Sequence, residues 1–183
     1  MNNIIEVFNR NVINIITLLS KGDFYLREIS ETLKFPPSAA HSAIKRLLRF
    51  GFIKVREQRN RKYFSIDREN ILLKRIKSFL NLEKLLNSKA YRKLRQLGKV
   101  GIYGSFADGS NDEHSDLDLW VYADKINPGS ASRISAIFER EFEVETNILI
   151  LNKNKLKNLK EKDPEFYSQI RFTSIFEGGS IFD

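Results

Sequence analysis

Two aspartates separated by a single residue are the first sign of chemistry in this 183-residue chain. Asp116 and Asp118 lie in the run Ser-Asp-Leu-Asp-Leu-Trp-Val, whose alternation of polar and apolar residues predicts a β-strand. In a strand both carboxylates point to one face, and the leucines between and after them point to the other. Two carboxylates this close repel each other unless a cation binds between them. Mg²⁺ suits such a pair, because it takes one or two carboxylates and completes its octahedron with water and phosphate oxygens.

A glycine–serine pair precedes the aspartates and is suited to hold a phosphate. Residues 99–103 form a short apolar run that enters a turn at Gly104 and Ser105, and Gly109 follows. Gly104 lets the backbone approach a phosphate without a Cβ in the way. Ser105 offers an amide and a hydroxyl at the expected start of a helix. The two motifs together predict a site for a metal ion and a phosphate.

These residues, in the run GSFADGSNDEHSDLDLW, resemble the GSx₃G...SDxDL signature of the DNA polymerase β-like nucleotidyltransferases, most closely their minimal, single-domain branch. The resemblance covers about residues 85–151 and implies an α/β domain with a mixed sheet. It implies that Gly104, Ser105 and Gly109 bind the triphosphate of an NTP, for which ATP is expected. It also implies that Asp116 and Asp118 bind Mg²⁺ or Mn²⁺. The implied reaction transfers a nucleoside monophosphate to a hydroxyl and releases pyrophosphate.

Two positions depart from the pattern of that family. Asp108 stands where the family often has arginine, and it adds a negative charge near the expected triphosphate. The family's third carboxylate lies on a later strand, which we expect at residues 142–150. There the usual pattern places the third position at Asn147, a neutral amide that binds metal poorly and cannot act as a base. Glu145, on the same face, has a longer side chain and is our candidate third catalytic carboxylate.

The charge of the chain is divided unevenly between its halves. The formal net charge is +8. Residues 1–100 contain 22 Lys and Arg against 8 Asp and Glu, whereas residues 101–183 contain 9 against 15. A half with a charge of +14 attracts polyanions, whereas a half with a charge of −6 repels a phosphate unless a cation intervenes. The first half is therefore expected to bind nucleic acid, the alternative being that its basic residues only solvate a helical surface.

Apolar spacing predicts three helices before residue 51. The first carries an apolar stripe that runs from Ile4, Ile5 and Phe8 to Leu19. The second carries Leu26, Ile29 and Leu33 and is separated from the third by two prolines. The inner face of the third helix is expected to consist of Ala40, Ile44, Leu47 and Leu48.

Two strand-like runs, residues 52–55 and 63–66, follow on either side of a basic turn at residues 56–62, which predicts a β-hairpin. Three helices and a basic hairpin resemble the winged helix-turn-helix DNA-binding domains of bacterial and archaeal regulators. In that family the third helix enters the major groove and the hairpin contacts the DNA backbone. The alternative is a module for protein docking or dimerisation. The resemblance implies DNA contacts from Ser38, His41, Ser42, Lys45 and Arg46 on the helix and from Arg59, Arg61 and Lys62 on the hairpin.

A long basic helical segment is predicted after the hairpin. It begins at Asp67, a candidate N-cap, and is expected to split near Ser88. Its apolar stripe can pack on either domain or pair with a second copy, so a homodimer is one expectation. Near the C-terminus, residues 153–162 form a basic amphipathic pattern, and Asp163 is placed to cap a helix that follows. The fold class is therefore α+β, with a winged helix-turn-helix at 1–67, a helical connector at 68–98 and a nucleotidyltransferase-like α/β domain with a mixed sheet at 99–183.

Composition excludes several other classes. The absence of cysteine excludes a disulfide framework and a thiolate zinc site. The chain shows neither the pattern of a signal peptide nor an apolar run that approaches the roughly 20 residues of a membrane helix. We therefore expect a cytoplasmic protein with no membrane partner.

Three functions are compatible with these patterns. The first is a Mg²⁺-dependent nucleotidyltransferase that carries a DNA-binding domain, and the intact Gly-Ser and Asp-x-Asp motifs favour it. The second is a DNA-binding transcriptional regulator whose other domain is a nucleotide sensor or is catalytically degenerate, and Asp108 and Asn147 favour it. The third is a component of a toxin–antitoxin system with a small helical protein partner.

Overall fold

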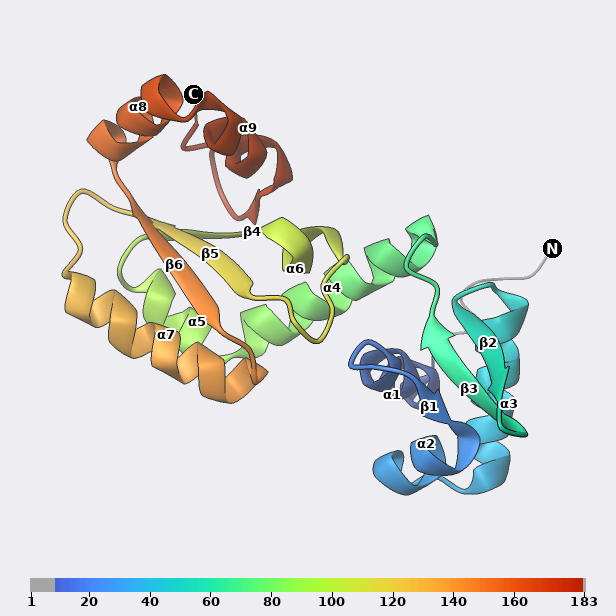
Figure 1. The fold of residues 1–183 in the computed structure, drawn as a ribbon. Helices are drawn as coiled ribbons and strands as arrows, with labels where there is room; N and C mark the ends of the chain where they lie inside the picture. The colour runs from blue at the N-terminus through green and yellow to red at the C-terminus, as the bar shows by residue number, and fades with distance from the viewer. Residues whose placement is uncertain (1–8, 183) are drawn as a thin grey trace. The chain divides into compact units, whose positions relative to one another are not determined.

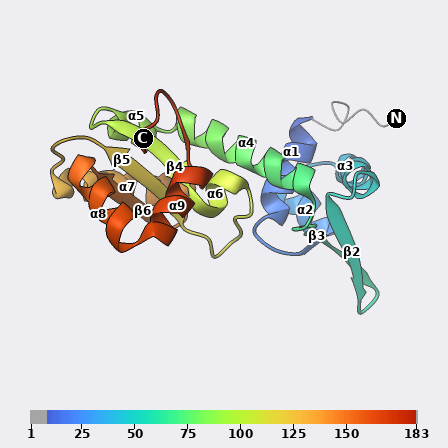
Figure 2. The same ribbon diagram turned by 90° about the horizontal axis from the view of Figure 1, so that it is seen from above.

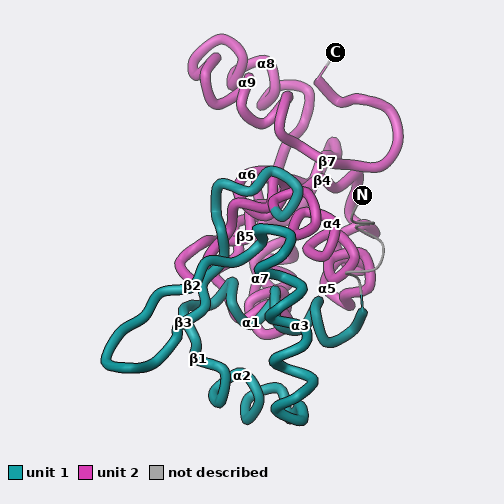
Figure 3. Tube along the Cα trace, turned by 90° about the vertical axis from the view of Figure 1, so that its right-hand side faces the viewer, with its two compact units in different colours: residues 1–73 teal, residues 74–183 magenta. Residues whose placement is uncertain are grey.

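The computed structural model describes residues 9–182, and the chain divides into two compact units, Met1–Leu73 and Lys74–Asp183 (Figure 3). The boundary falls within helix α4 (Ile71–Asn87). Most of the segment expected to be a connector therefore belongs to the second unit, where Leu85, Tyr91 and Leu94 join the hydrophobic core. No helix between residues 9 and 182 is long and apolar enough to cross a membrane.

Within residues 9–73 the first unit consists of three helices and a small antiparallel sheet (Figure 1). The helices are α1 (Arg10–Leu19), α2 (Leu26–Leu33) and α3 (Pro37–Arg49). The strands β1 (Phe24–Tyr25), β2 (Ile53–Gln58) and β3 (Arg61–Ile66) are ordered β1-β3-β2. This arrangement confirms the predicted winged helix-turn-helix. Of the stripe expected on the first helix, Val12, Ile15, Ile16 and Leu19 are buried, whereas Ile4, Ile5 and Phe8 lie outside the described residues.

One residue expected inside α3 is exposed. Ala40, Ile44 and Leu47 are buried as predicted, but Leu48 is 36% exposed. Ala43 is buried instead, because residues three and four positions apart share one face of a helix and Ala43 lies between Ala40 and Leu47 in that stripe. The prediction for Leu48 was wrong.

The hairpin turn is tighter than the predicted turn at residues 56–62. Gln58 pairs with Arg61, so only Arg59 and Asn60 form the turn. Both have positive φ, 48° and 59°, as a two-residue type I′ turn requires. This turn matches the twist of the two strands, which therefore extend further than the apolar runs indicated.

The start of α4 also differs from the prediction. Asp67 is not its N-cap, because the helix begins at Ile71 and the Asn70 Oδ1 accepts a hydrogen bond from the Leu73 amide at 3.0 Å. Asp67 instead forms an ion pair with Lys54 at 2.8 Å. The predicted split is confirmed: the Ser88 side chain accepts a hydrogen bond from the Tyr91 amide at 2.9 Å and caps α5 (Lys89–Arg95).

Between residues 74 and 182 the second unit contains a four-stranded mixed sheet of order β6-β5-β4-β7. Strands β5 (Leu117–Tyr122) and β6 (Thr146–Leu151) are parallel, whereas β4 (Lys99–Tyr103) is antiparallel to β5 and to β7 (Ile175–Phe176). Helices α5 and α7 (Pro128–Phe142) cover one face of this sheet. Helices α8 (Lys153–Lys162) and α9 (Pro164–Thr173) cover the other face (Figures 1 and 2).

Side chains of β5 alternate between the two faces of the sheet, and each face packs into its own hydrophobic core. Leu117, Leu119 and Val121 are buried against α5 and α7, and Trp120 is buried on the opposite face with residues of α8 and α9. The Trp120 indole lies over Gly101 of β4, where an added Cβ would stand 2.3 Å from the ring. Asp118 alternates with the two leucines and therefore shares the face of Trp120.

The C-terminal helices agree with the sequence, but the strand predicted at residues 142–150 is shorter. Asp163 caps α9 as expected, and its Oδ1 accepts a hydrogen bond from the Phe166 amide at 3.0 Å. Helix α7 continues to Phe142 and ends at Glu143, which adopts a left-handed conformation with φ 60°. Strand β6 therefore begins only at Thr146.

Candidate functional site

The two aspartates lie where β5 begins, beside the parallel strand β6. Asp116 precedes the strand, Asp118 is its second residue, and the register pairs Asp118 with Asn147. The Asn147 side-chain amide donates to the Asp118 Oδ1 at 3.3 Å and to the Asp116 Oδ2 at 3.4 Å. One neutral amide thus connects both carboxylates with two long, weak hydrogen bonds.

The environment of Asp118 disfavours its negative charge. Burial raises the pKa of the Asp118 carboxyl above its ordinary value, the hydrogen bond from Asn147 lowers it, and the charge of Asp116 raises it further. Tyr103 pairs with Asp118 across the sheet. Burial, and secondly the charge of Asp118, raises the pKa of Tyr103 to about 12. A cation bound at the two aspartates would relieve the repulsion between them.

The Gly-Ser turn lies directly beside this carboxylate pair. Gly104 follows β4, begins the short helix α6 (Gly104–Asp108) and has φ +68°. A Cβ at this position would stand 2.7 Å from the Asp118 Oδ2, so no side chain fits without moving the carboxylate. The Ser105 carbonyl accepts hydrogen bonds from the amides of Gly109 at 2.9 Å and Asn111 at 3.2 Å, which closes the loop.

Gly109 is required by the packing of the loop on α4. It has φ +82°, and a Cβ there would stand 1.9 Å from the Lys74 carbonyl oxygen and 2.8 Å from the Ser78 amide nitrogen. The loop backbone therefore lies against the α4 backbone. The resemblance to the family assigns Gly109 to the phosphates, and in the structure its missing Cβ also allows this packing.

Three polar side chains of α4 support the loop, and sequence reasoning missed them. The Ser78 hydroxyl donates to the Ala107 carbonyl, and the Lys77 ammonium donates to the Asn111 carbonyl. The Asn81 amide donates to the Phe106 carbonyl and to the Asn111 Oδ1, both at 2.9 Å. Lys77 and Ser78 are 7% and 6% exposed. The sequence signal for them was that polar residues interrupt the apolar helical pattern of this segment. Their burial is visible only in the structure.

Asp108 has a local structural role. It is exposed, and its Oδ1 accepts a hydrogen bond from the Ser110 amide at 2.7 Å. A side chain that bonds to the backbone two residues further on forms an Asx turn. The arginine that the family often has at this position could not accept that bond.

Glu145 is not grouped with the two aspartates. It precedes β6, its side chain is exposed, and its carbonyl accepts a hydrogen bond from the Leu117 amide at 2.8 Å. Between residues 9 and 182 no three His, Cys, Asp or Glu side chains lie close enough to hold one metal ion. The structure thus does not support Glu145 as a third ligand, because the register places Asn147 next to Asp118.

The donor set fits one magnesium ion. Asp116 and Asp118 supply the one or two carboxylates that Mg²⁺ usually takes from a protein, and the remaining positions belong to water and substrate phosphates. The raised pKa of Asp118 is partly caused by the neighbouring negative charge, as expected where a cation is to be bound. A second ion that needs a third carboxylate finds none here among the described residues.

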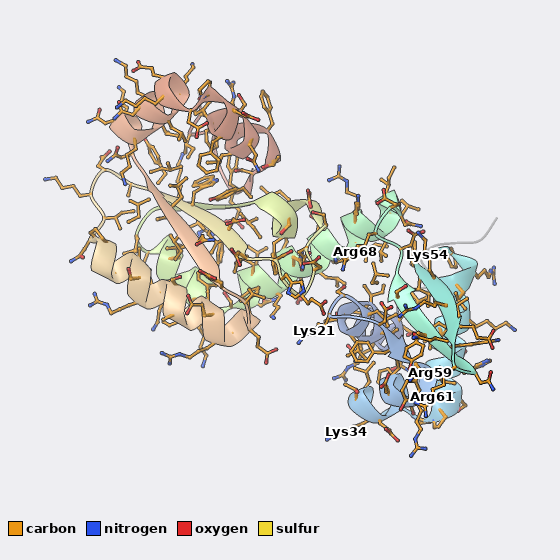
Figure 4. The ribbon with its side chains drawn as sticks, in the orientation of Figure 1. Lys21, Lys34, Lys54, Arg59, Arg61 and Arg68 are labelled. Atoms are coloured by element: carbon orange, nitrogen blue, oxygen red, sulfur yellow. The ribbon has the colours of Figure 1, made fainter. Side chains whose placement is uncertain are left out.

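The first unit presents the residues predicted to contact DNA on two of its elements. All of the α3 side chains in that set are exposed: Ser38, His41, Ser42, Lys45 and Arg46. Those of the hairpin, Arg59, Arg61 and Lys62, are exposed as well, and Figure 4 labels Arg59 and Arg61 on it. The Arg61 guanidinium lies 5.1 Å from the centre of the Tyr25 ring, which orients it by a cation–π contact.

A hollow of about 730 Å³ lies between α2, α3 and the hairpin. Its lining includes Ile44, Leu48 and Val55, and Leu48 and Val55 are 36% and 49% exposed. Lys45 and Lys62 also line it. Apolar side chains offer nothing to a phosphate, so a nucleic-acid backbone would contact the basic residues of this lining.

Comparison with known families agrees with both units. The family described as Polymerase beta, Nucleotidyltransferase matches residues 82–177, which include both aspartates and the Gly-Ser turn. The family described as Sugar-specific transcriptional regulator TrmB matches residues 15–69, from within α1 to just beyond the hairpin. No curated protein sequence matches the chain.

The chain belongs to the polymerase β nucleotidyltransferase family, and its N-terminal unit is similar to the TrmB regulators. The predicted fusion of a winged helix-turn-helix with a nucleotidyltransferase-like domain is thereby confirmed.

Proposed function

We propose that this protein is a magnesium-dependent nucleotidyltransferase whose N-terminal unit binds DNA. The observation that carries the proposal is the position of Gly104, whose missing Cβ leaves space directly against the Asp118 carboxylate. The Gly-Ser turn and the carboxylate pair are thus adjacent, as transfer from a metal-bound triphosphate requires.

Each residue has a distinct part in the proposed reaction. Gly104 gives the phosphates access to the backbone, and Ser105 donates hydrogen bonds to them. Asp116 and Asp118 would hold Mg²⁺, which neutralises the charge of the triphosphate when it is bound. The acceptor oxygen bonds to the α-phosphorus while the bond from that phosphorus to the β-phosphate oxygen breaks. Pyrophosphate leaves, and the hydroxyl proton passes to water.

A nucleotide sensor is the second candidate, and Asn147 favours it. The Asn147 amide stands beside Asp118, where the family has a carboxylate, and it cannot accept the proton of an acceptor hydroxyl. A site of this kind can bind a nucleoside triphosphate with its metal and transfer it slowly or not at all.

DNA binding is the proposed role of the first unit. Exposed basic residues lie on α3 and on the hairpin, the two elements with which winged helices contact DNA. The similarity to TrmB regulators supports this role. Because that match ends at residue 69, only the winged helix is compared, and no sugar specificity is carried over.

The test is calorimetric titration of each of the four NTPs, with and without Mg²⁺. The proteins are the wild type, the double variant Asp116→Asn, Asp118→Asn and the control Asp124→Asn, an exposed acid beyond β5. We expect Mg²⁺-dependent binding of one NTP that is lost in the double variant and retained in the control. Release of pyrophosphate that requires an acceptor and exceeds hydrolysis by water would then establish transfer.

Two other outcomes are informative. Mg²⁺-dependent binding without release of pyrophosphate, for any acceptor offered, would favour the sensor. If no NTP binds with Mg²⁺, both candidates are wrong, and the first unit alone carries the function.

A further inference from the structure

Helix α4 exposes three large apolar side chains at seven-residue spacing. Leu72, Phe79 and Leu86 are 56%, 66% and 44% exposed. Residues seven apart return to almost the same side of a helix, with a drift of about 20° per heptad. The three side chains therefore form one stripe, called here the α4 stripe, along a continuous helix (Figure 2).

The opposite side of α4 is already occupied. Leu73, Lys77, Ser78 and Leu85 are at most 7% exposed, and the two polar residues among them bind the loop of the candidate site. At 100° per residue these four positions lie across the helix from Phe79. The α4 stripe thus points away from the core that α4 helps to build.

The residues around Phe79 are arranged symmetrically along the helix. Leu72 and Leu86 each stand seven positions from Phe79, on either side of it. Arg75 and Glu83 each stand four positions from it, and both are exposed. If a second α4 packs antiparallel with its Phe79 opposite the first, each leucine meets the other leucine and each arginine meets a glutamate.

A parallel arrangement would lack this complementarity. It would place Arg75 beside Arg75 and Glu83 beside Glu83 of the other copy, and like charges at such distances repel. The charge pattern therefore favours the antiparallel arrangement and is complementary to a second copy of the same helix.

We propose that two copies of this chain associate through the α4 stripe, antiparallel and about a two-fold axis at Phe79. Such an interface is isologous, because each patch contacts the same patch of the other copy. It rests on one helix face and is smaller than most permanent interfaces, so association depends on protein concentration.

The first test is sedimentation equilibrium of the full chain from micromolar to about 1 mM protein. We expect the wild type to approach twice its monomer mass of 21.3 kDa. Phe79→Lys should weaken association by about tenfold or more. The matched control is Phe172→Lys, which changes a phenylalanine that is 78% exposed on α9 and should leave association unchanged.

Charge exchange tests the pairing of Arg75 with Glu83. Arg75→Glu and Glu83→Arg should each weaken association, and the double exchange should restore it. Circular dichroism of every variant verifies that the helices are retained. A wild type that stays monomeric over the whole range, or a Phe79→Lys variant that associates like the wild type, would overturn the proposal.

Cysteine cross-linking tests the direction of the helices, because the natural chain has no cysteine. Positions 72 and 86 are 14 residues apart, about 21 Å along a helix. We expect Phe79→Cys alone to form a disulfide-linked dimer, and Leu72→Cys to form one only when mixed with Leu86→Cys. Dimers of Leu72→Cys alone would show a parallel pair and contradict the proposed arrangement.

Discussion

The two units contain carboxylates with opposite pKa shifts. In the first unit, the hydrogen bond from Lys54 is the main reason why the pKa of Asp67 lies below its ordinary value. In the second, burial and the neighbouring charge of Asp116 hold the pKa of Asp118 above its ordinary value. The first carboxylate stabilises its unit, whereas the second carries a charge that its surroundings disfavour. Groups of the second kind gather at functional sites, since a ligand can supply the missing compensation.

A glycine in each unit shows that the units also differ in how closely their loops are packed. Gly51 and Gly109 both have positive φ, +66° and +82°. A Cβ on Gly51 would meet its nearest neighbour, the Asn70 side chain, at an ordinary 3.7 Å. A Cβ on Gly109 would overlap the α4 backbone. The loop of the candidate site is therefore held more tightly than the connection that follows α3.

The largest expected effect comes from adding a Cβ at Gly109, next to the α4 backbone. Gly109→Ala should destabilise the second unit by at least about 3 kcal/mol, since the strain of the backbone and the overlap with Lys74 add. Gly51→Ala, the matched change in the first unit, should cost about 1–2 kcal/mol, because only the backbone conformation is unfavourable. Urea denaturation monitored by circular dichroism measures both. Equal losses would show that the two units tolerate a Cβ alike.

A change at Gly104 should weaken NTP binding in addition to the loss of stability that its positive φ of +68° causes. In Gly104→Ala the new Cβ pushes against the Asp118 carboxylate, and Mg²⁺-dependent NTP affinity should fall about tenfold or more. Gly179→Ala is the control, because no atom lies within 4 Å of its Cβ position. Calorimetric titration compares the two variants. An unchanged affinity in Gly104→Ala would remove the Gly-Ser turn from the proposed site.

The opposite pKa shifts predict opposite pH dependences. Because the folded pKa of Asp67 is lowered, its contribution to stability is present above the ordinary value of about 3.9 and is lost as the pH falls through the folded pKa. Asp67→Asn should therefore lower the Tm at pH 7, and the difference should vanish in acid.

For Asp118 the sign is reversed. Its folded pKa is raised, so the unit loses stability as the pH rises from about 3.9 through that pKa. Asp118→Asn should raise the Tm at pH 7 and leave it unchanged at low pH. Scanning calorimetry between acid and neutral pH measures both variants, and a fall in Tm for Asp118→Asn at pH 7 would contradict the comparison.

The smallest expected effect concerns the hairpin of the first unit. Arg59→Ala and Lys62→Ala should each weaken DNA binding about equally for all sequences and reduce the slope of log affinity against log salt by about 1. Lys125→Ala, an exposed lysine of the second unit, should not change that slope. Filter binding over a range of salt concentrations tests this, and identical slopes for all three variants would exclude the hairpin from the interface.

Much of the fold could be predicted because its signals are local. Apolar spacing and capping residues predicted the three N-terminal helices, the interruption at Ser88 and the helix that Asp163 caps. The alternation around Leu117 also placed Asp116 and Asp118 on one face. Each of these depends on residues only a few positions apart.

What sequence reasoning missed depends on distant pairing. Strands β1 and β7 have two residues each and exist only through their partners β3 and β4. The support that Asn81 gives to the loop spans 25 or more positions. The hydrogen bonds from Asn147 to both aspartates likewise depend on the register of β6 against β5, although the sequence pattern had already placed the third position at Asn147.

Trp120 gives the second unit its own optical probe. It is the chain's single tryptophan, it is fully buried two residues after Asp118, and its indole nitrogen donates to the Ser174 hydroxyl at 2.9 Å. Its emission therefore reports on the unit that holds the aspartates, whereas the first unit contributes only tyrosine and phenylalanine. A chain of two units need not unfold in one step. Comparing emission with the total circular dichroism separates the two transitions without any added label.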